Sequence, residues 1–157
     1  MSRTTIEKFY AAFARLDGDA MQACYADDAS FDDEAFSLAG RAQIGGMWRM
    51  LTETTKAKAR DAWKLEASDT TDDSAHWEAW YRFIATGRNV HNIIEAKFAF
   101  DGAGLIKRHV DSFDFWRWSR QALGAPGVLL GWSPVLRNKV RTQAAANLAK
   151  FLASKAL

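Results

Sequence analysis

The sequence predicts an α+β fold in which three helices come first, antiparallel strands follow and a further helix ends the chain. Two observations carry this prediction. Apolar residues recur every three or four positions up to residue 54, and every two positions between residues 62 and 115. Turn-forming residues separate the later segments, as expected for strands joined by hairpins. Helices followed by a run of strands are typical of α+β proteins.

Three helices are predicted in the first part of the chain. The first covers residues 4–16 and the second residues 19–26, with Asp17-Gly18-Asp19 breaking the helical pattern between them. The third covers residues 41–54. The apolar stripes that would face the core are Ile6, Phe9, Tyr10, Phe13 and Leu16, then Met21, Cys24 and Tyr25, and finally Ile44, Met47, Trp48 and Leu51.

Five strands are predicted after the second helix. A short strand at residues 29–31 leads into an acidic turn. Four longer strands cover residues 62–67, 74–86, 89–100 and 105–115, with hairpin turns at 86–89 and 101–104.

The C-terminal part is predicted to be helical. A short helix over 116–123 is stopped by Gly124-Ala125-Pro126-Gly127, and a long helix follows over 135–157. We expect this tail to cross either the outside of the sheet or the mouth of a cavity. We expect residues 1–120 to form the main domain and residues 121–157 a helical extension packed on it.

The composition is ordinary for one globular domain of 157 residues, except that seven Trp and ten Phe need a core, cavity or interface to cover them. The net charge of +2 is small, but no acidic residue follows Asp114. The basic residues of the tail are Arg117, Arg120, Arg137, Lys139, Arg141, Lys150 and Lys155. Because they are spaced out, we favour a solvated helix face; an anionic partner, nucleic acid or lipid, is the alternative.

The cellular setting follows from what the sequence lacks. The single cysteine, Cys24, excludes an intrachain disulfide and favours a reducing compartment. The N-terminus has no secretory apolar core, and the longest nearly apolar stretch is too short to span a bilayer. We therefore expect a cytoplasmic protein without a membrane partner. The three His show no metal-ligand spacing, so no metal and no other cofactor are expected.

Two stretches resemble a known superfamily. FYAAFARLDGDAMQACYADDASFDD resembles the opening of ketosteroid isomerase and of SnoaL-like polyketide cyclases, and TGRNVHNIIEAKFAFDGAGLIKRHVDSFD resembles their last hairpin. Ketosteroid isomerase and the SnoaL-like cyclases are both members of the nuclear transport factor 2-like superfamily. The resemblance covers roughly residues 5–120 and implies its cystatin-like cone, with three helices packed on a curved antiparallel sheet. HVDSFDFWRWSRQALG resembles a SnoaL-like bacterial subgroup, largely of unassigned function, that has a C-terminal helical extension.

The acidic segment 25–36, YADDASFDDEAF, holds five carboxylates. Strand alternation places Asp33 on the inner face with Phe31 and turns Asp32 outward, while Asp27 and Asp28 are expected in a solvated turn. The resemblance to ketosteroid isomerase implies that Asp33 is a general base. The alternative is a strand-end Asp that binds nearby backbone amides. Glu34 stands where relatives often have Pro, which puts the direction of both acids in doubt.

Alternation along the longer strands predicts the cavity wall. One face of the strand at 74–86 is uncharged and suits a cavity, and the other carries His76, Glu78, Trp80 and Arg82. The predicted catalytic residues are Asp33, His109 and Asp111. The predicted ligand-binding residues are Tyr10, Trp48, Trp77, Tyr81, Asn92 and Phe113.

We expect a cofactor-independent, SnoaL-like enzyme that transfers a proton on a small apolar or aromatic carbonyl compound. Asp33 or Asp111 would be the base, His109 its partner or the acid, and Asn92 with Tyr10 or Tyr81 would bind a developing oxyanion. Steroid isomerisation itself is not expected, because Ala96 stands where the resemblance would require an acid. The Asp–Arg–Asp set of limonene epoxide hydrolases also fits poorly, since the sheet arginines are predicted to face outward.

The alternative from another class is a non-catalytic module that binds a ligand or pairs through its sheet, in which His109 and Asp111 form a satisfied polar pair. A homodimer is expected because Trp80 and Ile93 lie on the predicted outer face. A monomer would result if the C-terminal helix covered that face instead.

Overall fold

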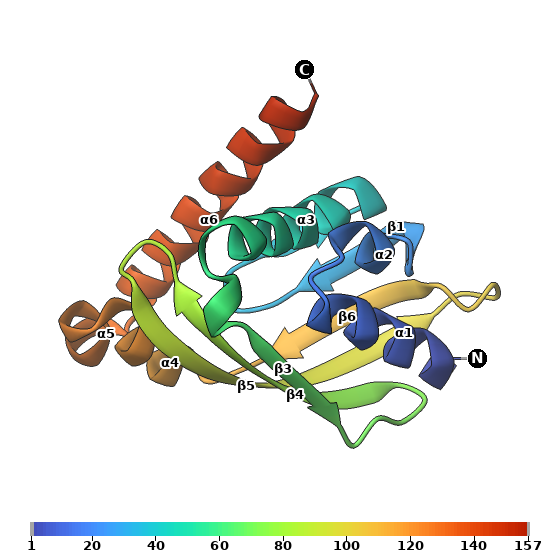
Figure 1. Ribbon diagram of the computed structural model, residues 1–157, viewed down its shortest axis with the longest axis horizontal. Helices are drawn as coiled ribbons and strands as arrows, with labels where there is room; N and C mark the ends of the chain where they lie inside the picture. The colour runs from blue at the N-terminus through green and yellow to red at the C-terminus, as the bar shows by residue number, and fades with distance from the viewer. Residues whose placement is uncertain (1, 157) are drawn as a thin grey trace.

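The computed structural model describes residues 2–156 and shows one curved sheet with helices on its concave side (Figure 1). Three helices, α1 (Ser2–Ala14), α2 (Gly18–Gln22) and α3 (Arg41–Lys58), lie over this side. The strands are β1 (Tyr25–Asp32), β2 (Ser37–Ala39), β3 (Lys64–Ser68), β4 (Ser74–Phe83), β5 (Arg88–Phe100) and β6 (Ile106–Ser112), with a 3-10 turn at Arg60–Ala62. The α+β prediction is confirmed.

The strand order is β2-β1-β6-β5-β4-β3. All neighbouring strands are antiparallel except β1 and β6, which run parallel. The long strands β4 and β5 pair over ten positions, from Ser74 opposite Lys97 to Phe83 opposite Arg88. This register places Trp77 opposite Ile94 and Ala79 opposite Asn92, so the inner faces of the two strands line the same side.

The prediction for the second helix was wrong at its end. That helix stops at Gln22, and Tyr25 is the first residue of β1, four residues before the predicted strand. The backbone of β6 provides the reason, because the amide of Ile106 donates to the carbonyl of Cys24 and Tyr25 pairs with Ile106. Sheet pairing thus overrides a helical apolar spacing in these residues. Strand β2 was not predicted, since its three residues show no clear alternation.

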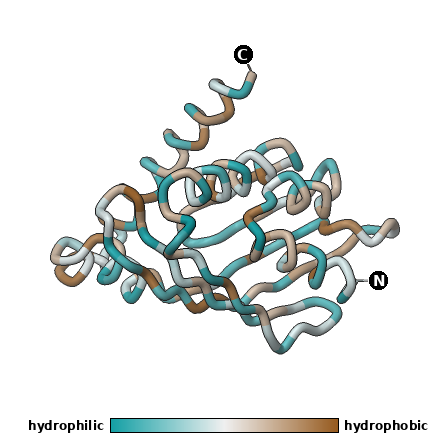
Figure 2. Tube along the Cα trace, in the orientation of Figure 1, coloured by the Kyte–Doolittle hydropathy of each residue, from teal (hydrophilic) through white to brown (hydrophobic). Residues whose placement is uncertain are grey.

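The core lies between the helices and the concave face of the sheet, and aromatic rings dominate it. Phe9 of α1 is fully buried at its centre. Its ring lies within 6.4 Å, centroid to centroid, of the rings of Tyr10, Phe13, Tyr25, Trp48, Phe98 and His109. Gly45 lets α3 approach α2, because a Cβ there would lie 2.2 Å from the Gln22 side chain. Figure 2 shows hydrophobic residues along the strands and helices around this core, and also in helix α5 (Ala125–Leu130) at one end of the molecule.

Three helices follow the sheet: α4 (Phe115–Leu123), α5 (Ala125–Leu130) and α6 (Pro134–Lys155). Helix α5 was not predicted; Gly124, with a φ of 72°, ends α4 as expected, but the chain turns directly into a new helix. Helix α6 packs on α3, where Leu148 and Leu152 lie against Gly46. Leu157, the last residue of the predicted long helix, lies outside the described residues.

The placement of α6 decides between the two positions expected for the tail. Its N-terminal half lines the cavity described below, and it leaves the convex face of the sheet uncovered (Figure 1). None of the helices described between residues 2 and 156 is long and apolar enough to cross a membrane.

Candidate functional site

A cavity of about 630 Å³ lies between α3, the concave face of the sheet and the C-terminal helices. Its wall is largely apolar, with rings from Phe13, Phe36 and Trp63 beside the residues predicted from the sequence. The predicted site residues that line it are Asp33, Trp48, Trp77, Tyr81, Asn92, Asp111 and Phe113. This volume is within the usual range for sites that hold small molecules.

Asp33 lies where β1 gives way to a tight turn, and its carboxylate is partly buried at the cavity wall. Its Oδ1 accepts hydrogen bonds from the amides of Ala35 at 2.7 Å and Phe36 at 2.6 Å. Removal from water raises its pKa from 3.8 to about 7; the charge of Asp111 adds to this, and the two amides oppose it. Asp33 therefore binds backbone amides, as the second alternative predicted, and it also faces the cavity; its role as a base stays a prediction.

The other acids of the segment are used differently. Asp27 forms an ion pair with Arg41, and Asp28 forms one with Lys107, which lowers the pKa of Asp28. Asp32 turns outward and accepts from the Ser37 hydroxyl at 2.6 Å. Asp27 and Asp28 were expected in a solvated turn; they lie instead on β1, but their side chains are solvated as expected.

Asp111 is linked to a chain of buried hydrogen bonds. The Trp48 indole donates to the Tyr25 hydroxyl at 3.0 Å, and that hydroxyl lies 2.7 Å from Nδ1 of His109. Nε2 of His109 lies 2.8 Å from Oδ1 of Asp111, which also accepts from the Trp77 indole at 3.4 Å. Side-chain exposure along this pair is 1% for His109 and 3% for Asp111, so water does not compete for these bonds.

The direction in which these hydrogen bonds are donated follows from the two ends of the series, Trp48 and Asp111. Because the Tyr25 oxygen already accepts from Trp48, its own proton is available for Nδ1 of His109. His109 then carries its proton on Nε2 and donates it to Asp111. In this arrangement each bonded atom of the four side chains has a partner, and the bonds select the His109 tautomer that carries its proton on Nε2. Burial raises the pKa of Tyr25 well above its usual range, which keeps its proton in place.

Two predicted site residues do not line the cavity. His109 lies behind Asp111, so it reaches the cavity only through that carboxylate. Tyr10 is buried in the core, where its ring packs near Trp77 and Phe98. Within the described chain the Tyr10 hydroxyl has no hydrogen-bond partner. Tyr10 is not among the residues that line the cavity, so its position does not support the expected contact with a ligand.

Tyr81 and Asn92 are the polar groups on the inner faces of β4 and β5. The Tyr81 hydroxyl accepts from the Trp118 indole at 2.9 Å and retains its own proton to donate. Burial raises the pKa of Tyr81 to about 12, and the nearby charge of Asp33 contributes. Both side chains are thus available as hydrogen-bond donors to a bound oxygen.

The mouth of the cavity is built by α6, whose contribution the sequence analysis missed. Arg141 donates to the backbone carbonyls of Asp33 at 3.1 Å and Glu34 at 3.0 Å, and Arg137 forms an ion pair with Glu34 at 3.2 Å. Two residues of the basic tail therefore fasten α6 to the turn that holds Asp33. The sequence did hold a signal for this contact. The tail has no acid to pair with Arg137 and Arg141, so a partner in the distant acidic segment 25–36 could have been expected.

Among residues 2–156, no group of three His, Cys, Asp or Glu side chains has the geometry of a metal site. Asp33 and Asp111 are the acids of the cavity wall, and Lys139 at the mouth is its cation. No arginine lines the wall described here; Arg82 pairs with Asp61, and Arg108 bonds to Ser30 outside it.

Comparison with solved structures supports the fold. A candidate polyketide cyclase from Silicibacter sp. TM1040 is 20% identical, with a TM-score of 0.60 over 77% of this chain and 94% of that one. An LEH-like epoxide hydrolase from M. tuberculosis is 18% identical, with a TM-score of 0.58 over 84% and 96%. A candidate isomerase from Bacillus subtilis is 16% identical, with a TM-score of 0.56 over 78% and 92%. No curated protein matches the chain. At these identities the likeness concerns the fold alone.

The comparison of sequence with family models gives one match. Residues 6–109 fit the model of the SnoaL-like domain, which is more than half of the chain. This stretch includes Asp33 and His109 and the inner faces of β4 and β5, and it ends before Asp111 and the C-terminal helices. The chain therefore belongs to the SnoaL-like domain family.

Proposed function

We propose that this protein binds a small apolar or aromatic carbonyl compound in its cavity and transfers a proton on it without a cofactor. The observation that carries the proposal is the pair of carboxyl groups, Asp33 and Asp111, on one apolar wall in two different settings. Burial raises the pKa of Asp33 to about 7. The carboxyl group of Asp111 accepts hydrogen bonds from His109 and Trp77. Acids set apart in this way are typical of sites that use one group as acid and another as base.

In the proposed reaction Asp111 removes a proton from the carbon next to the carbonyl group, and Asp33 returns a proton to the compound. Asp111 is the stronger candidate for the base because hydrogen bonds from His109 and Trp77 fix the direction of its carboxyl group at the cavity wall. Asp33, with a pKa of about 7, is present in both protonation states at neutral pH, so it can return a proton. Tyr81 and Asn92 would stabilise the negative charge that develops on the carbonyl oxygen. His109 acts through Asp111 and is a positioning residue.

The test uses exchange with solvent, so that the product need not be known. A panel of apolar cyclic ketones is incubated with the protein in D2O, and deuterium entry next to the carbonyl is followed by mass spectrometry. We expect exchange to fall by about 100-fold or more in Asp111→Asn, since general-base catalysis contributes on that scale. Asp33→Asn should lower it more at acidic pH than at alkaline pH, because only the protonated form of Asp33 can return a proton. Asp28→Asn, which alters a surface ion pair, is the matched control.

A non-catalytic binding module of the same fold is the second candidate, favoured by the satisfied bonds of both carboxyl groups. If both Asn variants bind an apolar fluorescent probe and exchange no slower than the unchanged protein, this second function replaces the first. Loss of exchange with retained probe binding supports catalysis.

We also propose a homodimer that pairs through the convex face of the sheet. Helix α6 leaves this face open, and Ile93 is exposed on it. An exposed apolar side chain on an uncovered sheet favours a partner there.

A further inference from the structure

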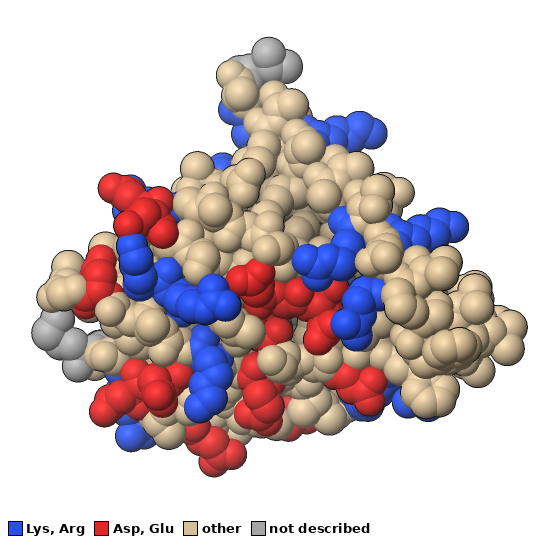
Figure 3. Space-filling view, turned by 180° about the vertical axis from the view of Figure 1, so that it is seen from behind, with Lys and Arg blue, Asp and Glu red and all other residues tan. Residues whose placement is uncertain are grey.

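Helix α5 and the segments beside it carry an exposed apolar surface. Leu129, Trp132 and Val135 are 68%, 69% and 72% exposed, well above any other large apolar side chain described outside this region. The surface, called the apolar tip below, consists of Trp116, Val128, Leu129, Leu130, Trp132 and Val135. Figure 3 shows the corresponding end of the molecule as a surface almost free of acidic side chains, with basic side chains beside it.

The apolar tip is part of the folded structure. The Trp116 indole donates to the Val128 carbonyl at 3.3 Å, and the Trp132 indole donates to the Leu129 carbonyl at 2.9 Å. Gly127 lets α5 lie directly on α4, because a Cβ at this position would be 1.9 Å from the Ser119 carbonyl oxygen. The polar atoms of both indoles are thus satisfied inside the protein, while their rings and the neighbouring aliphatic side chains face outward.

A surface concavity of about 640 Å³ adjoins the tip and is basic. Three of its lining residues are Arg88, Arg117 and Arg120, and the others are Gly87, Asn89 and Gln121. Arg120 connects the two features, since its guanidinium lies 4.8 Å from the centroid of the Trp116 ring.

The three arginines have no acidic partner in the part of the chain that the structure describes. Arg88 donates to the Gln121 carbonyl at 2.8 Å, and Arg117 donates to the His91 carbonyl at 2.6 Å. These bonds hold the side chains in place and leave their charge uncompensated. No acid follows Asp114 in the sequence, so the C-terminal helices cannot supply one.

We propose that the apolar tip and the arginine concavity together form a docking surface for a bilayer that contains anionic phospholipids. The Trp and aliphatic side chains of the tip enter the interface between headgroups and acyl chains, where apolar area is removed from water. The arginines bind phosphate oxygens of the headgroups, for which the planar guanidinium is well suited. A membrane partner was not expected from the sequence, which lacks a spanning segment, and a peripheral contact requires no such segment.

A bilayer fits both halves of this surface better than a second copy of the chain. A symmetric contact through the tip would bring the adjoining arginine concavities of both copies to the edge of the same interface. Because the adjoining helices contain no acid, this contact would bring like charges together. Free phosphate could occupy the concavity, but it would leave the apolar tip in water.

Docking at this surface has a consequence for the cavity. Leu123, Pro126 and Leu136 line the cavity wall and lie on the same helices as the tip. A docked protein would hold this side of the cavity next to the bilayer, where an apolar ligand is concentrated. The docking itself does not depend on the chemistry proposed for Asp33 and Asp111.

The test is co-sedimentation of the full chain with two kinds of vesicle, pure phosphatidylcholine and phosphatidylcholine mixed with phosphatidylglycerol. We expect binding to the mixed vesicles that weakens as NaCl is raised. The double variant Leu129→Ser/Trp132→Ser should lower the affinity by roughly tenfold or more, because two exposed apolar anchors are lost. Arg120→Glu should lower it by about fivefold or more.

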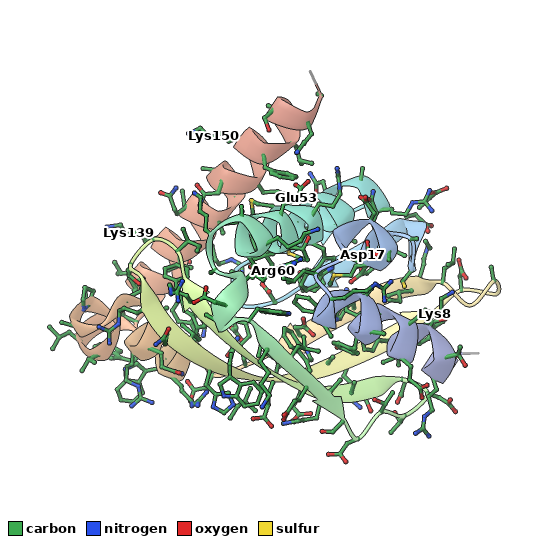
Figure 4. All side chains as sticks on the ribbon, viewed as in Figure 1. Lys8, Asp17, Glu53, Arg60, Lys139 and Lys150 are labelled. Atoms are coloured by element: carbon green, nitrogen blue, oxygen red, sulfur yellow. The ribbon has the colours of Figure 1, made fainter. Side chains whose placement is uncertain are left out.

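Two matched controls separate docking from general charge or apolarity. Lys150→Glu makes the same charge change as Arg120→Glu on a part of α6 far from α5 (Figure 4), and its affinity should stay within about twofold. Leu51→Ser removes an exposed apolar side chain from α3, outside both the tip and the proposed dimer face, and should leave vesicle binding unchanged. Circular dichroism of each variant verifies that the fold is retained.

The proposal is overturned if the protein does not co-sediment with the mixed vesicles, or if Lys150→Glu weakens binding as much as Arg120→Glu does. It is equally overturned if the tip variant leaves vesicle binding intact. A change of the tip variant from dimer to monomer in light scattering, without vesicle binding by the parent protein, would assign the tip to a contact between copies. Inorganic phosphate that protects the concavity from arginine-specific reagents, without vesicle binding, would assign it to a free anion.

Discussion

The two faces of the sheet each carry a network of histidine and carboxylate, and the networks behave differently. On the concave face, His109 and Asp111 are almost completely buried, with Tyr25 and Trp48 completing the chain of bonds. On the convex face, Glu78 binds His76 at 2.9 Å and His91 at 2.7 Å, with all three side chains between 23% and 31% exposed. Both networks join imidazole rings to a carboxyl group, and the surroundings of the two networks differ.

Burial explains what each network can do. On the convex face, hydrogen bonds from the His76 ring to Glu95 and Glu78 raise the pKa of His76, and hydrogen bonds from His76 and His91 lower the pKa of Glu78. The stability that His76 adds is complete below its ordinary pKa and is lost as pH rises through the raised one. On the concave face the bonds fix one tautomer and one direction. The exposed set of His76, Glu78 and His91 therefore responds to pH at the surface. The buried His109 instead holds the carboxyl group of Asp111 in one position.

The largest expected effect separates these two histidines. His109→Ala removes the acceptor of the Tyr25 proton and the 2.8 Å partner of Asp111 in a dry core, so we expect a loss of about 3–5 kcal/mol in the free energy of unfolding. His76→Ala removes a solvated pair and should cost about 1 kcal/mol or less. Urea denaturation at pH 7 measures both. Equal losses would show that the buried chain of hydrogen bonds is not the stronger support.

The next effect concerns Asp33, whose pKa of about 7 in the folded protein exceeds the ordinary value of 3.8. Its ionisation therefore opposes folding; this cost is absent below about pH 4, grows between pH 4 and 7, and is complete above pH 7. We expect Asp33→Asn to be more stable than the parent at pH 8, on the order of 2–3 kcal/mol, and similar at pH 4. Thermal and urea unfolding across this range measure the difference.

Asp28→Asn is the control for that series, because Lys107 lowers the pKa of Asp28. Its replacement should change stability in the opposite direction at pH 8, since it removes a favourable charge. An Asp33 carboxyl that titrates near pH 4 in a carbon-13 NMR experiment would contradict the prediction.

A smaller effect compares two buried tyrosines. Tyr25→Phe leaves the Trp48 indole and Nδ1 of His109 without their partner and should cost about 1–3 kcal/mol. Tyr10→Phe removes a hydroxyl that has no partner among the described residues, so it should be neutral within about 0.5 kcal/mol or stabilising. If the two variants lose equal stability in urea, a water molecule that bonds to the Tyr10 hydroxyl would be the explanation.

The smallest effect on folding is expected on the convex face. Ile93→Lys should change the free energy of unfolding of a monomer by about 0.5 kcal/mol or less, because Ile93 is already exposed. If the sheet pairs two copies, the same variant should convert a dimer to a monomer in size-exclusion chromatography with light scattering. A dimer that survives this change would place its interface elsewhere.

The sequence by itself determined the α+β class, the three first helices, the four long strands and the inward direction of Trp77, Asn92 and Asp111. These follow from the periods of 3.6 and 2, which are local properties of the chain. The resemblance pointed to Asp33, and strand alternation supported its direction.

Only the tertiary structure decided the partners that lie far apart in the chain. Tyr25 was predicted on a helix, and its pairing with β6 brought it to His109, 84 residues away. The placement of α6 turned Arg141 toward Asp33, and the packing of α5 on α4 left Trp132 in solvent. Such contacts depend on how whole elements pack, because local spacing fixes the face a side chain occupies and packing decides what it meets there.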